Sequence, residues 1–287
     1  MNLLKYIANN RVTIADGAIG TELFNAGLIG GEQNNLTNPE SVLKIHRSYL
    51  EAGSTLLTTN TLTMNRIFIE SHKMDIDIAR VNEAGAKLAR QAIGSNQFVL
   101  GDISSTGQLL EPYGELSEET FIRNFQEQAK ILSDNGVDAF IIETMMDLRE
   151  AICALRACKS ISSLPAFVTM SFSTIENGGR TIMGNSAKDC AISLTHEGAD
   201  AIGANCGTLD PENISMIMSQ LREYSPLPLI AQPNAGKPKL LNDITSFDMP
   251  PDKFADCLAK CIQNGASIIG GCCGTTPNHI KAITGLA

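Results

Sequence analysis

The stretch Asp134-Asn135-Gly136-Val137-Asp138-Ala139-Phe140-Ile141-Ile142-Glu143-Thr144 contains the pattern that decides the fold. Its glycine follows a helical apolar pattern, as a helix-ending glycine does, and leads into an apolar strand-like run that ends in polar residues. The same arrangement follows Gly53, Gly198 and Gly265. Seven residues beyond the four glycines stand Asn60, Glu143, Asn205 and Cys272, and eight residues beyond stand Thr61, Thr144, Cys206 and Cys273.

Short β-rich runs alternate with longer amphipathic segments along the whole chain. The expected strands are 12–16, 55–60, 98–103, 139–143, 166–172, 201–206, 229–233 and 267–272. The expected helices are 39–52, 76–93, 118–135, 148–161, 187–197, 212–224, 253–264 and 277–284, the last with Thr276 as N-cap and Pro277 at its first position. This alternation predicts an α/β protein, a (β/α)8 TIM barrel in which residues 1–287 form a single domain. The polar residues of the repeat fall at the carboxyl ends of the strands, where barrel enzymes build their active sites.

Composition argues against several classes of protein. A formal net charge of −9 is unsuited to binding a nucleic-acid backbone, which needs a basic surface. The sequence contains no apolar run of the roughly 20 residues that a membrane helix needs, and residues 1–6 lack the apolar core of a secretory signal. We therefore expect a cytoplasmic protein that binds neither nucleic acid nor membranes.

The chain has eight cysteines, and without a secretion signal we expect them to be reduced. Metal binding or catalysis is then favoured over a disulfide framework. Free cysteine within a helical pattern is commonly a small buried hydrophobe. We expect that packing role for the cysteines at 153, 158, 190, 257 and 261.

The other three cysteines, Cys206, Cys272 and Cys273, fall at the expected height of the active site. Neighbouring side chains on a regular strand point to opposite faces, so Cys272 and Cys273 can converge only where the strand ends. Flanking glycines at 270, 271 and 274 permit the close approach and unusual dihedrals that this requires. Because thiolates suit zinc and a catalytic zinc usually has three protein ligands, the pattern predicts a zinc site on these cysteines. Two buried thiols beside an unrelated third, or a vicinal disulfide, are the alternatives.

A zinc ion with three thiolate ligands carries net negative charge, so it is a poor Lewis acid for hydrolysis and better suited to hold a fourth thiolate. A free thiol, with a pKa of about 8.5, is only slightly ionised at neutral pH, and metal coordination deprotonates it. The predicted chemistry is alkylation of a bound thiol, with the three cysteines catalytic through the metal.

An amino-acid thiol would also need partners for its ammonium and carboxylate groups. Glu143 ends a very apolar strand, where an ionised carboxylate is costly without a cationic partner. Asp16 ends the first strand and leads into residues 17–21, a loop whose backbone N–H groups suit a carboxylate. Asn234, after the seventh strand, is a neutral acceptor for an ammonium or for zinc. The structural alternatives are a turn-capping role for Asp16, an ion pair of Glu143 with Arg149 or Arg180, and loop hydrogen bonding by Asn234.

Six motifs together resemble the homocysteine S-methyltransferase family, in the family's order and over nearly the whole chain. They are DGAIGTEL at 16–23, TNT at 59–61, ET at 143–144, GANCG at 203–207, QPNAG at 232–236 and GGCCGTTP at 270–277. The resemblance implies a (β/α)8 barrel with Zn2+ on Cys206, Cys272 and Cys273 and methyl transfer to the sulfur of homocysteine, which yields methionine. The candidate homocysteine-binding residues are Asp16, Gly17, Ala18, Ile19, Asn60, Glu143 and Asn234.

The methyl donor is less closely specified. The ending at 274–277 is similar to the homocysteine module of cobalamin-dependent methionine synthases, whose folate, corrinoid and activation modules this chain does not contain. We therefore expect a separate corrinoid protein carrying methylcobalamin as the donor. Relatives that use S-methylmethionine or betaine make such cationic donors the alternative, although a chain with no tryptophan and four tyrosines is poorly supplied with aromatic faces for them. The loops at 104–107 and 207–211 depart from the family pattern, which also leaves a different acceptor thiol open.

Three other functions are the rivals of this prediction. The first is a non-catalytic module that binds zinc or a thiol within a larger complex. The second is a dithiol redox enzyme that uses Cys272 and Cys273. The third, a Schiff-base aldolase, is the weakest, because no lysine stands at a strand end.

Overall fold

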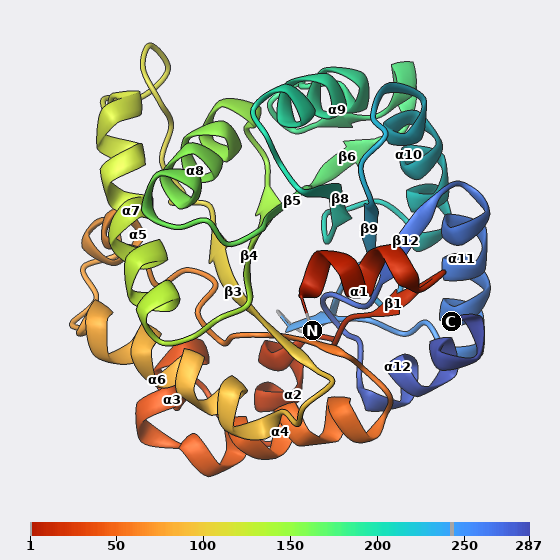
Figure 1. The fold of residues 1–287 in the computed structure, drawn as a ribbon, viewed down its shortest axis with the longest axis horizontal. Helices are drawn as coiled ribbons and strands as arrows, with labels where there is room; N and C mark the ends of the chain where they lie inside the picture. Colours follow the sequence, from red (N-terminus) through yellow and green to blue (C-terminus); the bar gives the residue numbers. More distant parts are fainter. Residues whose placement is uncertain (1, 242–243) are drawn as a thin grey trace.

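The computed structural model describes residues 2–241 and 244–287, and its centre is a barrel of eight parallel strands (Figure 1). The strands are β1 (Thr13–Ile14), β2 (Leu56–Thr58), β3 (Phe98–Ser104), β4 (Ala139–Met145), β5 (Ala166–Met170), β8 (Ala201–Asn205), β9 (Leu229–Gln232) and β12 (Ala266–Ile269). Each strand pairs in parallel with the next, β12 pairs with β1, and a bridge between Ala15 and Leu56 closes the circle. The predicted (β/α)8 barrel is confirmed.

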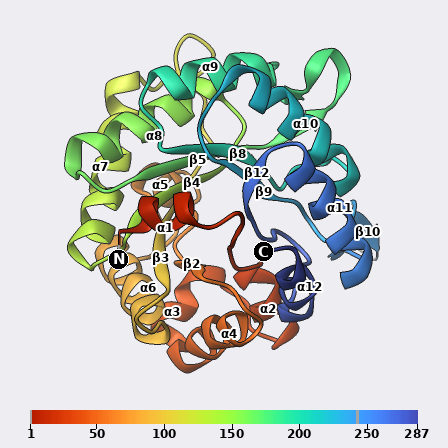
Figure 2. The ribbon, with the colours of Figure 1, turned by 45° about the vertical axis from the view of Figure 1, so that its right-hand side comes forward.

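A ring of helices surrounds the barrel (Figure 2). It consists of α4 (Pro39–Glu51), α6 (Ile78–Ala92), α7 (Glu118–Asp134), α8 (Leu148–Ile161), α9 (Ala187–His196), α10 (Pro211–Tyr224), α11 (Pro251–Gln263) and α12 (Pro277–Ile283). The eight predicted strands and eight predicted helices are all present, with small shifts at their ends. The four glycines of the repeat have φ angles of 110°, 83°, 86° and 100°, so they do end helices in the left-handed region. In the part of the chain that the structure describes, no helix has the length and apolarity to cross a membrane.

The amino end of the barrel is closed by a helix that the sequence pattern did not predict. This helix, α1 (Leu3–Asn9), lies at the centre of Figure 1, and Asn2 caps it by accepting a hydrogen bond from the Lys5 N–H at 3.3 Å. Leu3 and Ile7 join an apolar cluster inside the barrel, separate from the larger core between barrel and helices. The cluster also contains Leu56, Phe98, Leu100, Ile141, Phe167, Ile230 and Ile268.

Short elements in the loops after the strands build the carboxyl face. They are α2 (Ile19–Asn25), η1 (Gly31–Gln33), α3 (Asn34–Thr37), α5 (Arg66–Ser71), the β6–β7 hairpin (Phe172–Thr174 and Arg180–Thr181) with η2 (Glu176–Gly178), and the β10–β11 hairpin (Lys239–Leu241 and Ile244–Ser246); a last turn, η3 (Thr284–Leu286), ends the chain. The expectation of a loop over residues 17–21 was partly wrong, because α2 begins at Ile19.

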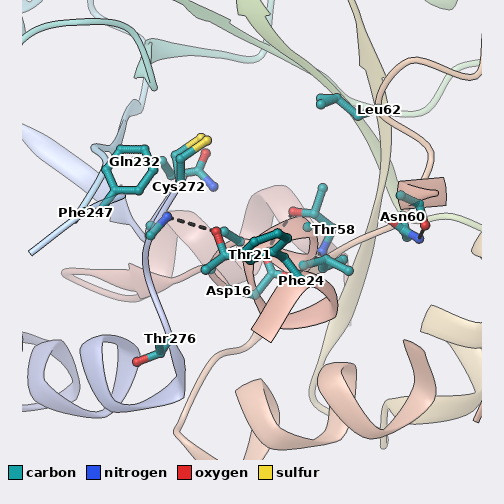
Figure 3. Close-up of a pocket in the computed structure, with 18 of the residues that line it drawn as sticks. Asp16, Thr21, Phe24, Thr58, Asn60, Leu62, Gln232, Phe247, Cys272 and Thr276 are labelled. Carbon is teal, nitrogen blue, oxygen red and sulfur yellow. Dashed lines mark hydrogen bonds between the residues drawn. The ribbon is translucent and has the colours of Figure 1, made fainter. Parts of the chain in front are cut away.

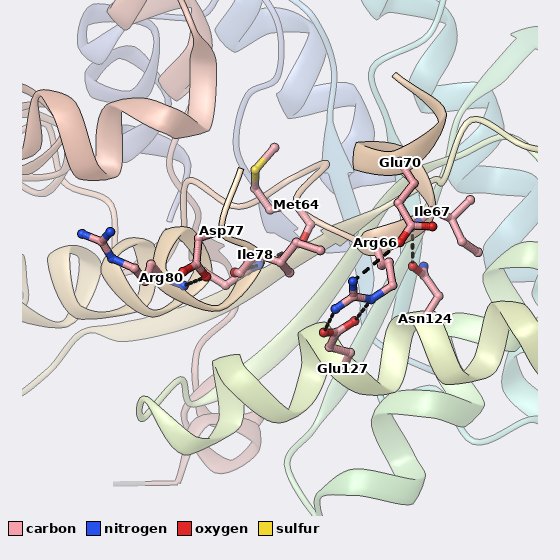
Figure 4. Close-up of polar contacts among 10 residues, drawn as sticks. Met64, Arg66, Ile67, Glu70, Asp77, Ile78, Arg80, Asn124 and Glu127 are labelled. Atoms are coloured by element: carbon pink, nitrogen blue, oxygen red, sulfur yellow. Dashed lines mark hydrogen bonds and ion pairs between the residues drawn. The ribbon is translucent and has the colours of Figure 1, made fainter. Parts of the chain in front are cut away.

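Polar contacts fasten α5 to α7 (Figure 4). The Arg66 guanidinium pairs with both carboxylate oxygens of Glu127 and lies 3.6 Å from Glu70. The Ile67 N–H donates to Asn124 Oδ1 at 2.8 Å. The loop after β2 is thereby held on the outer ring, which fixes one side of the carboxyl face.

Candidate active site

The interior of the barrel changes from apolar to polar at the carboxyl ends of the strands. A cavity of about 1070 Å³ opens there, above the apolar cluster. Its walls are the start of α2, the end of β2, Asp102 of β3, Glu143 of β4, Gln232 of β9 and residues 271–274. Figure 3 shows Cys272 next to Gln232 and Phe247 on one side of this pocket, with Thr58 and Asn60 on the other.

The structure brings the three predicted zinc ligands together. The sulfur atoms of Cys206, Cys272 and Cys273 all lie within 4.8 Å of one another, and those of Cys206 and Cys273 are 3.8 Å apart. Four ligands around zinc at a bond length of about 2.3 Å place sulfurs about 3.8 Å apart, so the spacing fits the metal. All three thiols are free and partly exposed, and the vicinal disulfide is not formed. Zinc binding itself stays a prediction.

Backbone contacts explain how two adjacent cysteines reach one point. The Cys272 N–H donates to the carbonyl of Pro233 and the Cys273 carbonyl accepts from Ala235 N–H, both at 2.9 Å, so the pair lies against the chain that follows β9. A Cβ at Gly271 would lie 2.5 Å from the Thr275 side chain, which only glycine avoids. Cys206 has a left-handed φ of 56°, which turns its sulfur toward the pair.

The three sulfurs strongly affect one another's ionisation. Hydrogen bonds from Cys272 and Cys273 lower the pKa of Cys206, while the same contact with Cys206 raises the pKa of Cys272 and of Cys273. The cluster therefore favours a single thiolate, and a cation is required to hold all three as thiolates. The other five cysteines are buried, and burial raises their pKa; for Cys190 and Cys261 it reaches about 12. Their predicted packing role is confirmed by this burial.

Glu143 faces the cavity, and none of the described residues is a cationic partner for it. Burial, together with the charges of Cys206 and Asp16, raises the pKa of its carboxyl to about 8. The alternative of a structural ion pair is wrong, because Arg149 pairs with Glu118 at 2.9 Å and Arg180 donates to the carbonyl of Gly184 at 2.8 Å. The carboxyl of Glu143 is therefore available to a ligand.

Asp16, two residues beyond the end of β1, lines the same cavity. Its two carboxylate oxygens accept hydrogen bonds from the backbone N–H of Thr58 at 2.8 Å and from the Thr58 hydroxyl at 2.9 Å. Burial raises its pKa to about 7 despite these donors. Of the neighbouring loop, Gly17, Ala18 and Ile19 line the cavity, but the Ala18 N–H already donates to Thr275 Oγ1 at 3.1 Å.

The two asparagines predicted to bind homocysteine, Asn60 and Asn234, differ in which side-chain amide atoms remain available to a ligand. Asn60 lines the cavity, but its Nδ2 donates to Asn35 Oδ1 at 3.0 Å and so helps to hold α3. Asn234 lies outside the cavity lining, and its Nδ2 donates to the carbonyl of Gly207 at 2.9 Å, as the loop-bonding alternative proposed. Its Oδ1 is buried and has no hydrogen-bond partner among the described residues, which leaves one oxygen for a cation.

Sequence reasoning missed Asp102, which lines the cavity and is 4% exposed. Its Oδ1 is buried with no hydrogen-bond partner among the described residues, and burial, followed by the charge of Glu143, raises the pKa of its carboxyl. A signal was present, since Asp102 stands eight residues beyond Gly94. Glu32 was also missed and brings the carboxyl groups in the cavity wall to four, with no lysine or arginine among the described lining residues. Such a wall suits a ligand with a positive charge.

Comparison with known proteins places the chain among sulfur methyltransferases. The family model described as homocysteine S-methyltransferase matches residues 13–286. The methionine synthases of Mycobacterium leprae (strain TN) and Mycobacterium tuberculosis (strain ATCC 25618 / H37Rv) are each 31% identical, over 98% and 96% of this chain. Both alignments cover 25% of the relative, so the chain spans about a quarter of the length of these proteins.

Solved structures share the whole fold. The homocysteine methyltransferase MmuM from Escherichia coli matches in its metallated form with a TM-score of 0.81 and in its oxidized form with 0.82, at 21% identity in both cases. The match covers 99% of both chains in the first and 100% of both in the second. At this identity the likeness concerns the fold.

Proposed function

Because the chain belongs to the homocysteine S-methyltransferase family, we propose that it is a zinc-dependent enzyme that methylates the thiol of homocysteine and yields methionine. The observation that carries the proposal is the convergence of three sulfurs at the wall of a cavity rich in carboxyl groups. In this proposal residues 1–287 form one homocysteine-binding barrel, and the methyl donor comes to its open carboxyl face.

Cys206, Cys272 and Cys273 would hold the zinc ion, with one position left for a ligand. When bound, zinc would lower the pKa of a substrate thiol so that its sulfur is a nucleophile at neutral pH. The Oδ1 of Asn234, which is buried and bonded to none of the described residues, adds a neutral oxygen acceptor for the metal or for the substrate ammonium.

The carboxyl groups would hold the amino-acid end of homocysteine. Glu143 has no cationic partner among the residues that the structure describes, so an ammonium group would compensate its burial. Asp16, fixed by its two bonds to Thr58, supplies a second carboxyl of set orientation. Backbone N–H groups at the start of α2 would receive the substrate carboxylate, with the exception of the Ala18 N–H, which Thr275 occupies. These contacts orient the substrate sulfur for in-line attack on a methyl group.

A methyl-corrinoid carried by a separate protein is the proposed donor. The similarity to methionine synthases supports this choice. Several large apolar side chains are exposed in the segments that follow the strands, and apolar surface near the mouth of a pocket suits contact with another protein. They include Phe24 (57% exposed), Ile29 (88%), Tyr113 (77%), Ile182 (71%) and Leu240 (70%).

A small cationic donor such as S-methylmethionine or betaine is the second candidate. The observation that favours it is the acidic wall of the cavity, which lacks lysine and arginine among the described lining residues. At about 1070 Å³ the cavity is slightly larger than the roughly 300–1,000 Å³ common for ligand pockets, so it has room for two small molecules.

Offering different donors to the zinc-loaded protein tests the proposal. Homocysteine would be supplied with methylcobalamin, S-methylmethionine, betaine or methyltetrahydrofolate in separate assays, with methionine as the readout and metal-stripped protein as the control. We expect methionine from methylcobalamin and none after zinc is stripped. Turnover with S-methylmethionine or betaine alone would favour the second candidate. Full activity without metal would refute the zinc mechanism, and binding of homocysteine without turnover from any donor would indicate a non-catalytic module.

A further inference from the structure

Two strand ends of the site carry a residue other than glycine in the left-handed backbone region. Thr144, directly after Glu143, has a φ of 60°, and Cys206, directly after Asn205, has a φ of 56°. A β-branched residue such as threonine rarely adopts this conformation, so neighbouring contacts must hold it in place. The contacts that hold Thr144 in this conformation are therefore of interest for the site.

The side chain of Asn205 makes these contacts. Its Oδ1 accepts hydrogen bonds from the Thr144 N–H and the Thr169 hydroxyl, both at 2.8 Å. Because a backbone N–H can only donate, the atom that faces it is the carbonyl oxygen, which fixes the orientation of the amide. The Nδ2 group then donates to Thr144 Oγ1 at 2.7 Å and to Cys272 Sγ at 3.7 Å.

Asn205 thus touches both halves of the site while it remains 1% exposed. Its bond to the Thr144 N–H fixes the peptide plane between Glu143 and Thr144. The backbone from which the Glu143 side chain extends is therefore held in place. Its N–H on the Cys272 sulfur stabilises negative charge there, as outer-shell donors to metal ligands do. Asn205 itself does not line the cavity, so it acts through other residues.

We propose that Asn205 is a positioning residue that couples the ammonium-binding end of the site to its metal-binding end. This inference rests on the proposed function, since it assigns Glu143 and the three cysteines their roles. One amide holds the left-handed turn behind Glu143 and supports the charge of Cys272. A purely structural role in the wall of the barrel would affect folding stability and leave both binding affinities unchanged.

The test measures zinc and homocysteine affinities in a double-mutant cycle. Zinc affinity is obtained by competition with a chelating dye, and homocysteine affinity by calorimetry on zinc-saturated protein. In Asn205→Ala we expect zinc affinity to fall by about 10–100-fold, as for other outer-shell partners, and homocysteine affinity to fall as well. Thr144→Gly removes the strain of the left-handed turn, so in Asn205→Ala/Thr144→Gly we expect homocysteine affinity to return toward that of Thr144→Gly alone, while zinc affinity stays low.

Asn82→Ala is the matched control. Asn82 is a fully buried amide on α6 that donates to the carbonyls of Met64 and Ile78, and it lies outside the cavity lining. Its loss should lower the melting temperature and leave both affinities within twofold. Equal affinity losses in Asn82→Ala, unchanged affinities in Asn205→Ala, or no recovery with Thr144→Gly would each overturn the proposal.

Two further arrangements keep the test decisive. If Asn205→Ala does not fold, Thr169→Val removes one hydrogen bond to Asn205 Oδ1, and both affinities should fall by about two- to tenfold; unchanged affinities contradict the coupling. If the wild-type protein binds zinc but not homocysteine, the proposed function fails, while the zinc affinity of Asn205→Ala still decides the contact with Cys272.

Discussion

The two ends of one barrel interior are built from the same strands and have opposite chemistry. Toward the amino end, Leu100, Ile141 and Phe167 pack in an apolar cluster beneath α1. Two residues further along β3 and β4, Asp102 and Glu143 face the cavity. Within the described part of the chain, Asp102 Oδ1 has no hydrogen-bond partner and Glu143 has no cationic partner. Burial stabilises the fold at the first end and raises the free energy of ionised groups at the second.

The difference separates what folds the chain from what lets it act. The amino end can be judged by volume and apolar contact, because its side chains need no ligand. The carboxyl end holds carboxyl groups with raised pKa values and three thiols that favour a single negative charge. The ionised forms of these groups become favourable only when a cation binds beside them. Substitutions at the two ends should therefore affect different measurements.

The largest expected effect is on stability, from Phe167→Ala at the amino end. Phe167 is fully buried in the inner cluster, and removing a buried phenyl ring costs about 3–5 kcal/mol. Urea unfolding should show this loss, while the folded variant keeps the zinc content of the wild-type protein. Loss of zinc from the folded variant would show that the two ends are not independent.

The second prediction is the opposite outcome, in which zinc is lost and folding stability is kept. Cys272→Ser should abolish stoichiometric zinc binding and reduce methionine formation by more than the 10–100-fold typical of outer-shell partners, because a ligand itself is lost. The free energy of unfolding of the metal-free protein should change by less than about 1 kcal/mol. Metal analysis and urea unfolding provide the two measurements.

The same chemical change at Cys158 is the matched control. Cys158 is a fully buried helix residue whose pKa is raised by burial. A hydroxyl without a partner there costs about 1–3 kcal/mol, so Cys158→Ser should lower stability and leave zinc bound. If Cys158→Ser released the metal, or Cys272→Ser retained it, the assignment of the ligands would be wrong.

The amino-end core and the carboxyl-end site also differ in how far sequence could predict them. The barrel followed from the alternation of patterns, and the height of the site followed from the register of Gly53, Gly136, Gly198 and Gly265. The helix α1 was missed because its seven residues are too few for a periodic pattern to stand out. Periodicity finds long elements that bury a regular face, and α1 buries only Leu3 and Ile7.

Within the site, sequence found the groups at strand ends but not their partners. Glu143 and the three cysteines were recognised by residue type and position. The bonds of Asp16 to Thr58 and of Asn205 to Thr144 join different strands, and no spacing along one chain encodes such contacts. Counting eight residues from Gly94, as was done from the four glycines of the repeat, would have identified Asp102. The φ of Gly94 is not in the left-handed region, so this glycine differs from those four.

The third prediction concerns Glu143→Gln, which keeps the shape of the side chain and removes its charge. Hydrogen bonds to charged groups contribute about 1.5–3 kcal/mol, so the KM for homocysteine should rise about 10–100-fold. Stability should stay the same or rise, because a partly buried carboxyl without a cationic partner becomes a neutral amide. Steady-state kinetics and thermal unfolding would be compared. An unchanged KM, or a clear fall in stability, would mean that Glu143 stabilises the fold, as the residues of the amino end do, and does not bind homocysteine.

The smallest effect, taken per pH unit, is a change in how folding stability depends on pH. The pKa of Asp16 is raised from 3.8 to about 7, so between these values the folded chain keeps a proton that the unfolded chain has released. The unfolded state then binds fewer protons, and stability falls as pH rises, by at most about 1.4 kcal/mol per pH unit for one group. Asp16→Asn should flatten this part of the profile in metal-free protein, as measured by urea unfolding from pH 4 to 7.

Glu197 at the end of α9 provides the opposite sign. Its hydrogen bonds from Arg156 lower the pKa of its carboxyl, so its contribution to stability is present above the unfolded pKa and is lost as pH falls. Glu197→Gln should therefore change the profile only at the acid side, and little, because the pair is exposed. If Asp16→Asn left the slope between pH 4 and 7 unchanged, the burial of Asp16 would not raise its pKa, and Asp16 would not contribute to the ionisation cost that distinguishes the carboxyl end of the barrel from the amino end.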